Sequence, residues 1–522
     1  MRLFKGPRVA PGLAAILVFA ALATPCAGAN AVFWTGTGAT NNISDPANWG
    51  GVAPAPGDSL NFLMGHPSVN IDVANASYSS VYISEGLPFT FSGNTMEITG
   101  VFLTATSVTF NNPVRLGPNF SLRFAGLSQS VIFSAGSSLT TEGGTISLGA
   151  SGPPGTIDIQ RDITETSPTA MTMIGAPGLP ADIYIRGSNG MSGGVTVSSN
   201  ANLHLGSLAS LGSGVPQVWG TILLANPDSS ELVIPNSLQL NAGGKLNLSG
   251  SGPFRLTGSI NSQGGGVVSS VPVTLAGGIF GSFVVGPGAG PFDFQTVTTA
   301  PLFVNGTTAH IPASSWASVS VTNGGILRLD ASSYDFNSGF TCDATSTIAM
   351  TLGGSVINAP SGGGCNFQLT IPPSLAIPAS GFIPIAMWTN VQSGSFTSNA
   401  NFAEGRAVNV NGTTMQVTYH GGYGSALGLV LPVGSGAPRP VTSLTTVTGL
   451  KDVSIARGTT KSNFIRAIAG AAGGPSANNQ ISFTILGGCG SFAGGASSVN
   501  VNTDVNGNAV APSYTAPSNV TV

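Results

Sequence analysis

Short runs of alternating apolar and polar residues recur along most of the chain. From residue 30 to about 432, runs of β-branched or aromatic residues are separated by Gly, Ser, Asn and Pro. Alternation with a period of two is typical of a strand that buries one face. No stretch here has a clear helical period, so the pattern predicts an all-β fold. The runs that show the alternation best are 107–110, 121–124, 130–133, 145–148, 156–159, 182–185, 203–205, 238–240 and 327–329.

The close spacing of these runs favours a repeat architecture. Strands that follow one another every 10–25 residues or so are too many and too regular for one sandwich. We therefore predict a right-handed parallel β-helix, a solenoid, over residues 65–432, with roughly 20 residues per turn and about 4.8 Å between turns. Gly and Asn suit its corners because they tolerate a left-handed backbone. An array of β-sandwiches is the alternative.

Composition changes the expected surface. Only 7% of the 522 residues are charged, against roughly 25% in an average soluble domain, and 74 are glycine. The formal net charge is −3, and nothing in it attracts nucleic acid or an anionic membrane. With 42% hydrophobic residues the chain is not of the disordered type. We expect a surface solvated by Ser, Thr, Asn and Gly rather than by ions.

The first 29 residues have the pattern of a signal peptide. A basic start is followed by an apolar run at 12–23 and by a small-residue cleavage pattern at 27–29. This run is shorter than the roughly 20 residues that span a bilayer, and no later segment is long enough. We expect export to the extracellular space or the cell surface, with no transmembrane segment in this chain.

Residues 191–224 resemble the autotransporter-associated β-strand repeat. "SGGVTV", "LHLG", "ASLGSG" and "GTILL" fill the places of its turns and strands, although the full pattern is clear only once. Proteins of this kind often begin with a W-x-G…N-W…P…G-D…F segment, in which Trp34, Trp49 and Asp58 hold three positions here. The resemblance implies an N-terminal cap at 30–64 that covers the open end of the solenoid. A tryptophan platform for sugar is the alternative.

The C-terminal part changes in style. A Pro/Gly/Ser linker at 433–442 is followed by residues 443–522, which resemble a bacterial immunoglobulin-like domain of the invasin and intimin type. The segment "ISFTILGGCGSFAGGASSVNVNTDVNGNAVAPSYTAP" carries this resemblance. It implies a β-sandwich in which Asp504 and Gly507 form a turn between strands. Since that family continues its last strand beyond "NVTV", we expect this domain to be truncated. Residues 462–474 fit a short helix or a strand.

Cys342 and Cys365 are 23 residues apart, close to one turn of the predicted helix. Stacked positions in adjacent turns bring Cα atoms about 5 Å apart, within the roughly 4.4–6.8 Å that a disulfide accepts. Export permits oxidation. The spacing predicts a disulfide, with two buried free thiols as the alternative, whereas Cys489 has no expected partner.

Acidic residues are mostly isolated. The densest group is Asp158, Arg161, Asp162 and Glu165, but on a strand its members divide between two faces and form no ready acid pair. A second group, Asp330, Asp335 and Asp343, can meet only across turns.

Other catalytic signatures are missing from the sequence. Histidines at 66, 204, 310 and 420 have no zinc spacing, and no G-x-S-x-G motif is present. We therefore expect no catalytic residue, no cofactor and no metal site. The sequence favours an exported bacterial structural or adhesive protein that is not an enzyme and binds an unknown protein or glycan through its β-helix surface. The alternative is a carbohydrate-active β-helix enzyme, a polysaccharide lyase or a glycoside hydrolase.

Overall fold

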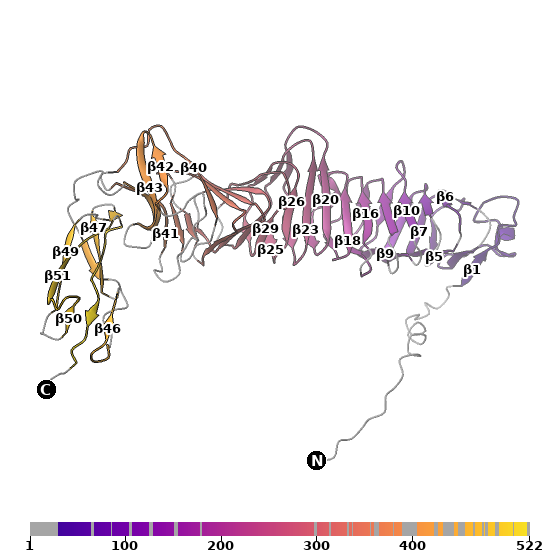
Figure 1. Ribbon diagram of the computed structural model, residues 1–522. Coiled ribbons are helices and arrows are strands. Elements are labelled where there is room, and N and C mark those ends of the chain that lie inside the picture. Colours follow the sequence, from indigo (N-terminus) through magenta and orange to yellow (C-terminus); the bar gives the residue numbers. More distant parts are fainter. Residues whose placement is uncertain are drawn as a thin grey trace, which may run out of the picture. The chain divides into compact units, whose positions relative to one another are not determined.

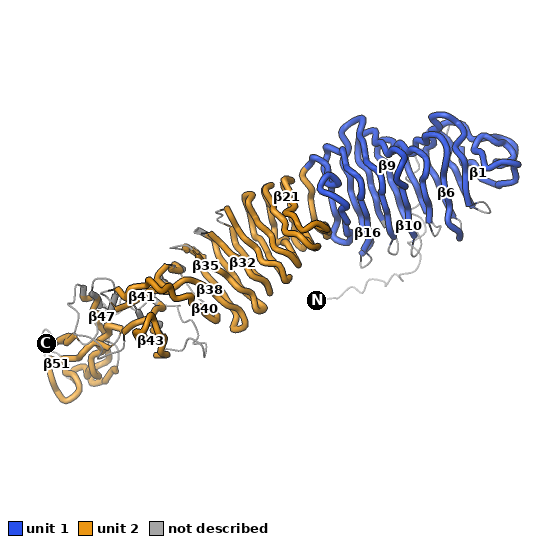
Figure 2. Tube along the Cα trace, turned by 90° about the horizontal axis from the view of Figure 1, so that it is seen from above, with its two compact units in different colours: residues 1–214 blue, residues 215–522 orange. Residues whose placement is uncertain are grey.

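A computed structural model gives the protein as an all-β chain with a parallel β-solenoid of about 13 turns. This confirms the predicted parallel stack and rules out the sandwich array for that region. The chain divides into two compact units, residues 1–214 and 215–522, which are described separately (Figure 2). The structure describes residues 30–63, 67–84, 86–103, 107–124, 129–150, 155–177, 180–296, 300–312, 315–330, 334–336, 338–354, 356–359, 365–378, 381–388, 405–421, 426–431, 443–446, 455–462, 465–471, 474–475, 479–485, 490–504 and 506–518. The predicted signal peptide and linker lie outside these residues.

The first unit contains two parallel sheets whose strands follow one another along the chain (Figure 1). One sheet has, in pairing order, β1 (Ala31–Trp34), β2 (Ser59–Phe62), β5 (Ser80–Ile83), β7 (Met96–Leu103), β9 (Val114–Phe124), β12 (Gly144–Ala150), β15 (Thr169–Ile174) and β17 (Val195–Val197), with β4 (Ala76–Tyr78), β11 (Leu139–Thr141) and β14 (Ile163–Glu165) beside it. The other has β3 (Ser68–Ile71), β6 (Phe89–Gly93), β8 (Ser107–Phe110), β10 (Gln129–Phe133), β13 (Gly155–Ile159), β16 (Ala181–Ile185) and β18 (Ala201–Leu205). Two 3-10 helices, η1 (Pro46–Trp49) and η2 (Leu208–Leu211), complete the unit.

The second unit uses three parallel sheets for most of its turns. The first of them has β19 (Gln217–Val218), β22 (Leu238–Leu240), β25 (Ile260–Ser262) and β28 (Ile279–Phe280). The second has β20 (Thr221–Asn226), β23 (Lys245–Gly250), β26 (Gly266–Ser269), β29 (Phe283–Val285), β31 (Leu302–Asn305), β34 (Val319–Thr322) and β37 (Phe340–Cys342). The third, called the groove sheet below, has β21 (Leu232–Ile234), β24 (Phe254–Leu256), β27 (Val273–Leu275), β30 (Phe292–Phe294), β32 (Thr308–Ile311), β35 (Ile326–Leu329), β38 (Thr347–Thr351) and β40 (Asn366–Thr370).

Parallel pairing stops before residue 432, the predicted end of the β-helix. A further sheet begins with the parallel strands β33 (Ser315–Trp316), β36 (Tyr334–Phe336), β39 (Ile357–Ala359) and β41 (Phe382–Trp388). It continues with antiparallel strands, β44 (Ala426–Val430), β43 (Thr413–Gly421) and β42 (Ala407–Val410). The predicted boundary was wrong here because the connection between β42 and β43 is a short hairpin, and a hairpin joins antiparallel strands.

The described residues from 443 onward form three small antiparallel sheets. Residues 462–474, for which helix and strand both remained open, contain a strand, β47. The strands are β45 (Ser443–Thr446), β46 (Thr460–Lys461), β47 (Arg466–Ala471), β48 (Gly474–Pro475), β49 (Gln480–Thr484), β50 (Ser491–Phe492), β51 (Ser498–Asn502), β52 (Asn508–Val510) and β53 (Tyr514–Thr515).

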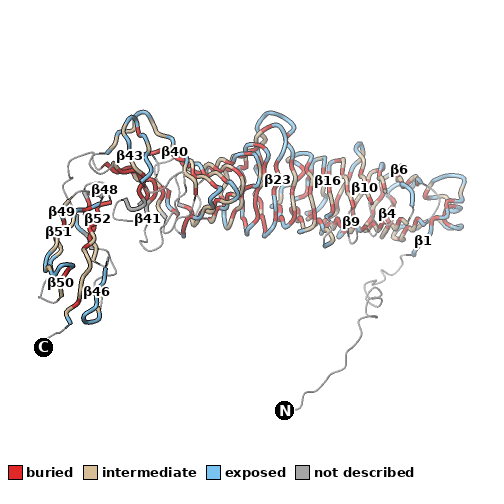
Figure 3. Tube along the Cα trace, viewed as in Figure 1, coloured by how far each residue is buried: buried red, intermediate tan, exposed pale blue. Residues whose placement is uncertain are grey.

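The solenoid core is built by the inward residue of each alternating pair (Figure 3). Phe91, Phe110 and Phe133 occupy one register position in successive turns of the first unit. Their rings stack with centroids 4.9 Å and 5.1 Å apart. Burial of each phenylalanine stabilises the fold by about 1.5–3 kcal/mol, so the alternation that marks the strands also holds the turns together.

At the corners between strands, glycine lets the backbone of one turn pass close to the backbone of the next turn. Gly250 ends β23 with a φ of 124°, and a Cβ atom there would lie 2.0 Å from the carbonyl oxygen of Asn226 in the preceding turn. Only glycine fits so close an approach between two turns. The high glycine content therefore serves the tight stacking of the corners.

Candidate functional site

The N-terminal aromatic residues are buried. Trp34 and Trp49 are 3% and 7% exposed, and their ring centroids are 4.9 Å apart in an edge-to-face arrangement. Both rings lie 5.7 Å from the ring of Phe62, and the indole N–H of Trp49 donates to the carbonyl oxygen of Ile43 at 2.8 Å. Buried rings that are nearly perpendicular present no flat platform to a sugar. Their packing is that of a cap on the first turns.

Asp58 of the cap motif and Asp504 of the predicted C-terminal turn accept backbone hydrogen bonds. Asp58 is buried and accepts from the N–H groups of Asn30 at 3.0 Å and Ala55 at 2.8 Å. Asp504 accepts from two backbone N–H groups, each at 2.9 Å. Gly507 follows with a φ of 69°, which a non-glycine residue rarely adopts. These three residues fix the local backbone conformation.

A disulfide joins Cys342 and Cys365, whose Cα atoms are 5.2 Å apart. Cys342 ends β37 and Cys365 immediately precedes β40, so the bond crosses a corner between two sheets. The expectation that the two residues occupy directly stacked positions was therefore wrong in this detail, although the pairing itself is the predicted one. Cys489 lies outside the described residues.

Arg161, the basic member of the first acidic group, is 4% exposed and directed inward. Its burial lowers the pKa of the guanidinium to about 10, which leaves it protonated at neutral pH. Backbone carbonyl groups of two preceding turns accept its hydrogen bonds, and this arrangement closes a corner. The acceptors are Phe110, Asn112 at 3.0 Å, Ser134 at 2.7 Å and Ser138 at 3.1 Å.

The acids of that group also bind within the fold. Asp158 forms an ion pair with Arg186 at 2.7 Å, Asp162 accepts from the Ser188 N–H at 2.7 Å, and Glu165 accepts from two backbone N–H groups. Each carboxylate thus binds and stabilises a neighbouring segment of the chain. The group is structural and contains no acid pair aimed at a common point.

The second acidic group is not assembled. Asp330 follows β35 of the groove sheet, Asp335 lies in β36 of another sheet, and Asp343 follows β37 of a third. Asp343 accepts hydrogen bonds from the Thr345 hydroxyl at 2.7 Å and from further donors, and these bonds lower its pKa to about 2. The three carboxylates therefore lie in or beside three different sheets and do not gather into one site among the described residues.

One outward-facing row of the groove sheet brings together functional groups that are far apart in sequence. Because the strands pair in parallel register, each strand contributes one residue to this row, and each residue of the row is paired with the residue of the next turn. The row, called the polar row below, contains Val233, Arg255, Thr274, Asp293, His310, Arg328, Ala349 and Gln368.

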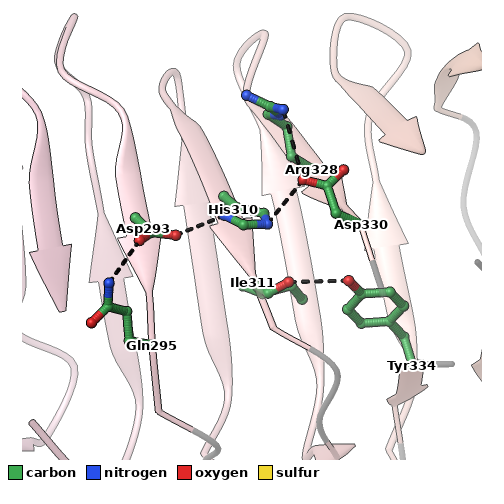
Figure 4. A network of polar contacts seen from close by, with 7 residues as sticks. All are labelled: Asp293, Gln295, His310, Ile311, Arg328, Asp330 and Tyr334. Atoms are coloured by element: carbon green, nitrogen blue, oxygen red, sulfur yellow. Dashed lines mark hydrogen bonds and ion pairs between the residues drawn. The ribbon is translucent and has the colours of Figure 1, made fainter. Parts of the chain in front are cut away.

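His310 lies at the centre of a contact network along this row (Figure 4). Its Nδ1 is 2.7 Å from an oxygen of Asp293, and its Nε2 is 3.1 Å from an oxygen of Asp330. A guanidinium nitrogen of Arg328 lies 3.7 Å from the same Asp330 oxygen. One oxygen of the Asp330 carboxylate therefore contacts both His310 and Arg328, while 48% of the Asp330 side chain stays exposed.

Beside this network the outer face of the groove sheet is hollowed. The cavity has a volume of about 370 Å³ and lies over β32, β35, β38 and β40. In the polar row, Ala349 stands between the longer Arg328 and Gln368, so a short side chain forms the depression. Its lining includes Thr308, Ile326, Arg328, Asp330, Ala349, Thr351, Gln368 and Thr370.

A second polar cluster lies on β16 and β18 of the first unit. The rings of Tyr184 and His204 stack 4.1 Å apart, the guanidinium of Arg186 lies 5.1 Å from the Tyr184 ring, and His204 is 3.1 Å from a carboxylate oxygen of Asp182. The side chains of this cluster therefore contact one another. His66 lies outside the described residues, and so does the side chain of His420.

Metal and membrane features are scarce in what the structure describes. Among the described residues, no three His, Cys, Asp or Glu side chains gather in a way that holds a metal ion. No described helix has the length and apolar character needed to cross a membrane.

Comparison with protein-family models, curated proteins and solved structures finds no match to this chain. The two sequence resemblances therefore have no independent support. The site must be interpreted from its own geometry.

The sequence did not identify the groove. Asp293 and His310 are 17 residues apart, whereas Asp158 and Arg186, also in adjacent turns, are 28 apart. Because the turn length varies, spacing alone does not show which residues share a row. The available signal was a set of long polar residues at the centres of short strands, among them the Arg328 of the predicted strand 327–329.

Proposed function

We propose that the protein is an exported bacterial surface or extracellular protein with a structural or adhesive role, which acts by binding through the outer faces of its solenoid and not by catalysis. The observation that carries the proposal is the polar row with its groove. Strand residues in a hydrogen-bonded stack hold such a surface rigidly, which reduces the entropy lost when a partner binds.

The occupancy of the carboxylates supports a non-catalytic role. Asp330 is the one carboxylate among the described residues that line the groove. Glycoside hydrolysis generally requires two carboxyl groups on opposite sides of the scissile bond. Asp293, the other acid of the network, contacts His310 and Gln295 and is not part of the groove lining.

A carbohydrate-active enzyme is the second candidate. It is favoured by one specific observation, namely that an exposed carboxylate and an imidazole lie in contact beside a groove. A histidine within hydrogen-bond reach of a carboxylate is a common arrangement for proton transfer.

The location and the domain types belong to the same proposal. The signal-peptide pattern of residues 1–29 supports export, and the alternation and cap motifs support an autotransporter-like passenger region. The C-terminal segment is proposed as an immunoglobulin-like module of the invasin and intimin type. Association with the cell surface follows from this combination.

Product analysis with the purified exported chain tests the proposal. The chain is incubated with xylan, dextran and polygalacturonate, and the length of each polymer is measured by chromatography. We expect every polymer to keep its length. Release of short saccharides by the natural chain, abolished by Asp330→Asn, would overturn the non-catalytic role and establish the enzyme.

A further inference from the structure

We propose that the groove over β32, β35, β38 and β40 binds a neutral saccharide, with Ala349 beneath the sugar and Arg328, Asp330 and Gln368 around it. This inference rests on the proposed binding function and gives it a ligand class and a place.

The charge of the groove favours a neutral ligand. Arg328 and Asp330 bring one positive and one negative group to its wall, 3.7 Å apart, with side chains 56% and 48% exposed. The Asp330 carboxylate would repel an acidic polymer, and the Arg328 guanidinium would repel a polyamine. Because the two charges offset each other locally, neither class of ion is favoured over an uncharged molecule.

The hydrogen-bonding groups match hydroxyl groups. Arg328 only donates, the Asp330 carboxylate only accepts, and the Gln368 amide does both. The threonine hydroxyls of the lining add groups that take either role. A sugar hydroxyl also donates and accepts, so neighbouring hydroxyls can satisfy this mixture without leaving a buried polar group unpaired.

The remaining lining is apolar. Ala349 and Ile326 are only partly exposed, and they offer a methyl surface between the polar groups. A sugar ring has one face made of C–H groups, which fits such a surface. Pockets that combine apolar contact with a few placed polar groups are the general form of small-molecule sites.

The dimensions fit a short stretch of a polysaccharide. The groove crosses four neighbouring strands, and three strand intervals of about 4.8 Å give about 14 Å along the stack. Its volume of about 370 Å³ lies within the range of about 300–1,000 Å³ for ligand pockets. One sugar unit is close in length to one strand interval, so two or three units can follow the row of strands.

Native affinity electrophoresis of the full exported chain tests this inference. Gels contain hydroxyethyl cellulose, xylan or dextran as neutral polymers, or polygalacturonate as an acidic one. We expect at least one neutral polymer to retard the chain, with little effect of added salt. Ala349→Trp, which fills the groove, should raise the dissociation constant at least tenfold.

Two further variants separate the groove from the fold. Gln368→Ala shortens an exposed side chain without touching the core and should weaken binding several-fold. Asn261→Trp places the same ring at an exposed position of β25, in another sheet and outside the groove lining, and should leave binding unchanged.

Three results would overturn the inference: no retardation by any neutral polymer, retardation only by polygalacturonate, or equal retardation of the natural chain, Ala349→Trp and Gln368→Ala. Failure of the proposed function is distinguishable from these results. Cleavage of a polymer that Asp330→Asn abolishes would contradict the non-catalytic role while the groove still binds sugar.

Discussion

At the residue scale, several charged side chains outside the groove hold turns and corners of the fold. Asp343 illustrates this, since it accepts hydrogen bonds from Thr345 and Ser346 side chains and from the Asn323 N–H at 2.7 Å. Arg161 carries the opposite charge and donates to backbone carbonyl groups at a corner of the first unit. In the sequence, these residues belong to the two groups considered as candidate catalytic sites. Several of their hydrogen-bond partners come from neighbouring turns, and the local sequence pattern does not show which residues of those turns lie beside them.

Asp343 gives a pH-dependent prediction. Its folded-state pKa of about 2 lies below its ordinary value of 3.8, so the charged form stabilises the fold above about pH 4 and this contribution is lost as the pH falls through about 2. Denaturant unfolding should show that Asp343→Asn is less stable than the natural chain at pH 6, and that the gap closes towards pH 2. Thr345→Val, which removes one donor, should show a smaller gap. A gap that stays constant over this range would contradict the assignment.

At the element scale, much of the fold could be predicted from the sequence. All nine runs with clear alternation lie within strands, and the parallel pairing of the solenoid was also predicted. The alternation of buried and exposed positions depends only on neighbouring residues, so it predicts the strands directly from the sequence. Register and turn length could not be predicted from the sequence, because they depend on how many residues each corner contains. The position of the groove depends on register and on turn length, so the groove was not predicted either.

The cap gives the prediction at this scale. Replacement of a buried tryptophan by alanine costs about 3–5 kcal/mol, so Trp49→Ala should reduce the stability of the first unit by that order. Hydrogen exchange should show lost protection in β1 and β2 first, since Trp49 packs against Trp34 and Phe62.

Trp219 provides the control for the cap. Its side chain is 38% exposed and lies outside the cap, so Trp219→Ala should reduce stability by clearly less than Trp49→Ala and leave exchange in β1 and β2 unchanged. Similar losses in the two variants, or unchanged exchange in β1 and β2 of Trp49→Ala, would contradict the capping role.

At the scale of the whole molecule, the groove exists because the strands of the groove sheet pair in parallel register. That register alone brings His310, Arg328, Ala349 and Gln368, which are spread over almost 60 residues of sequence, into one outward row. The row supplies the network, the groove and the proposed binding surface. A shift of one residue would turn these side chains inward and remove all three.

Cysteine cross-linking measures this register most directly. Ala349 and Gln368 are paired in adjacent parallel strands, and neighbouring strands about 4.8 Å apart fall within the Cα range of roughly 4.4–6.8 Å for a disulfide. The double variant Ala349→Cys, Gln368→Cys should form a disulfide between the two introduced cysteines under mild oxidation, identified by peptide mapping. The pair Ala349→Cys, Leu369→Cys, one residue out of register, should keep its introduced thiols free. Cross-linking of the second pair and not of the first would contradict the account.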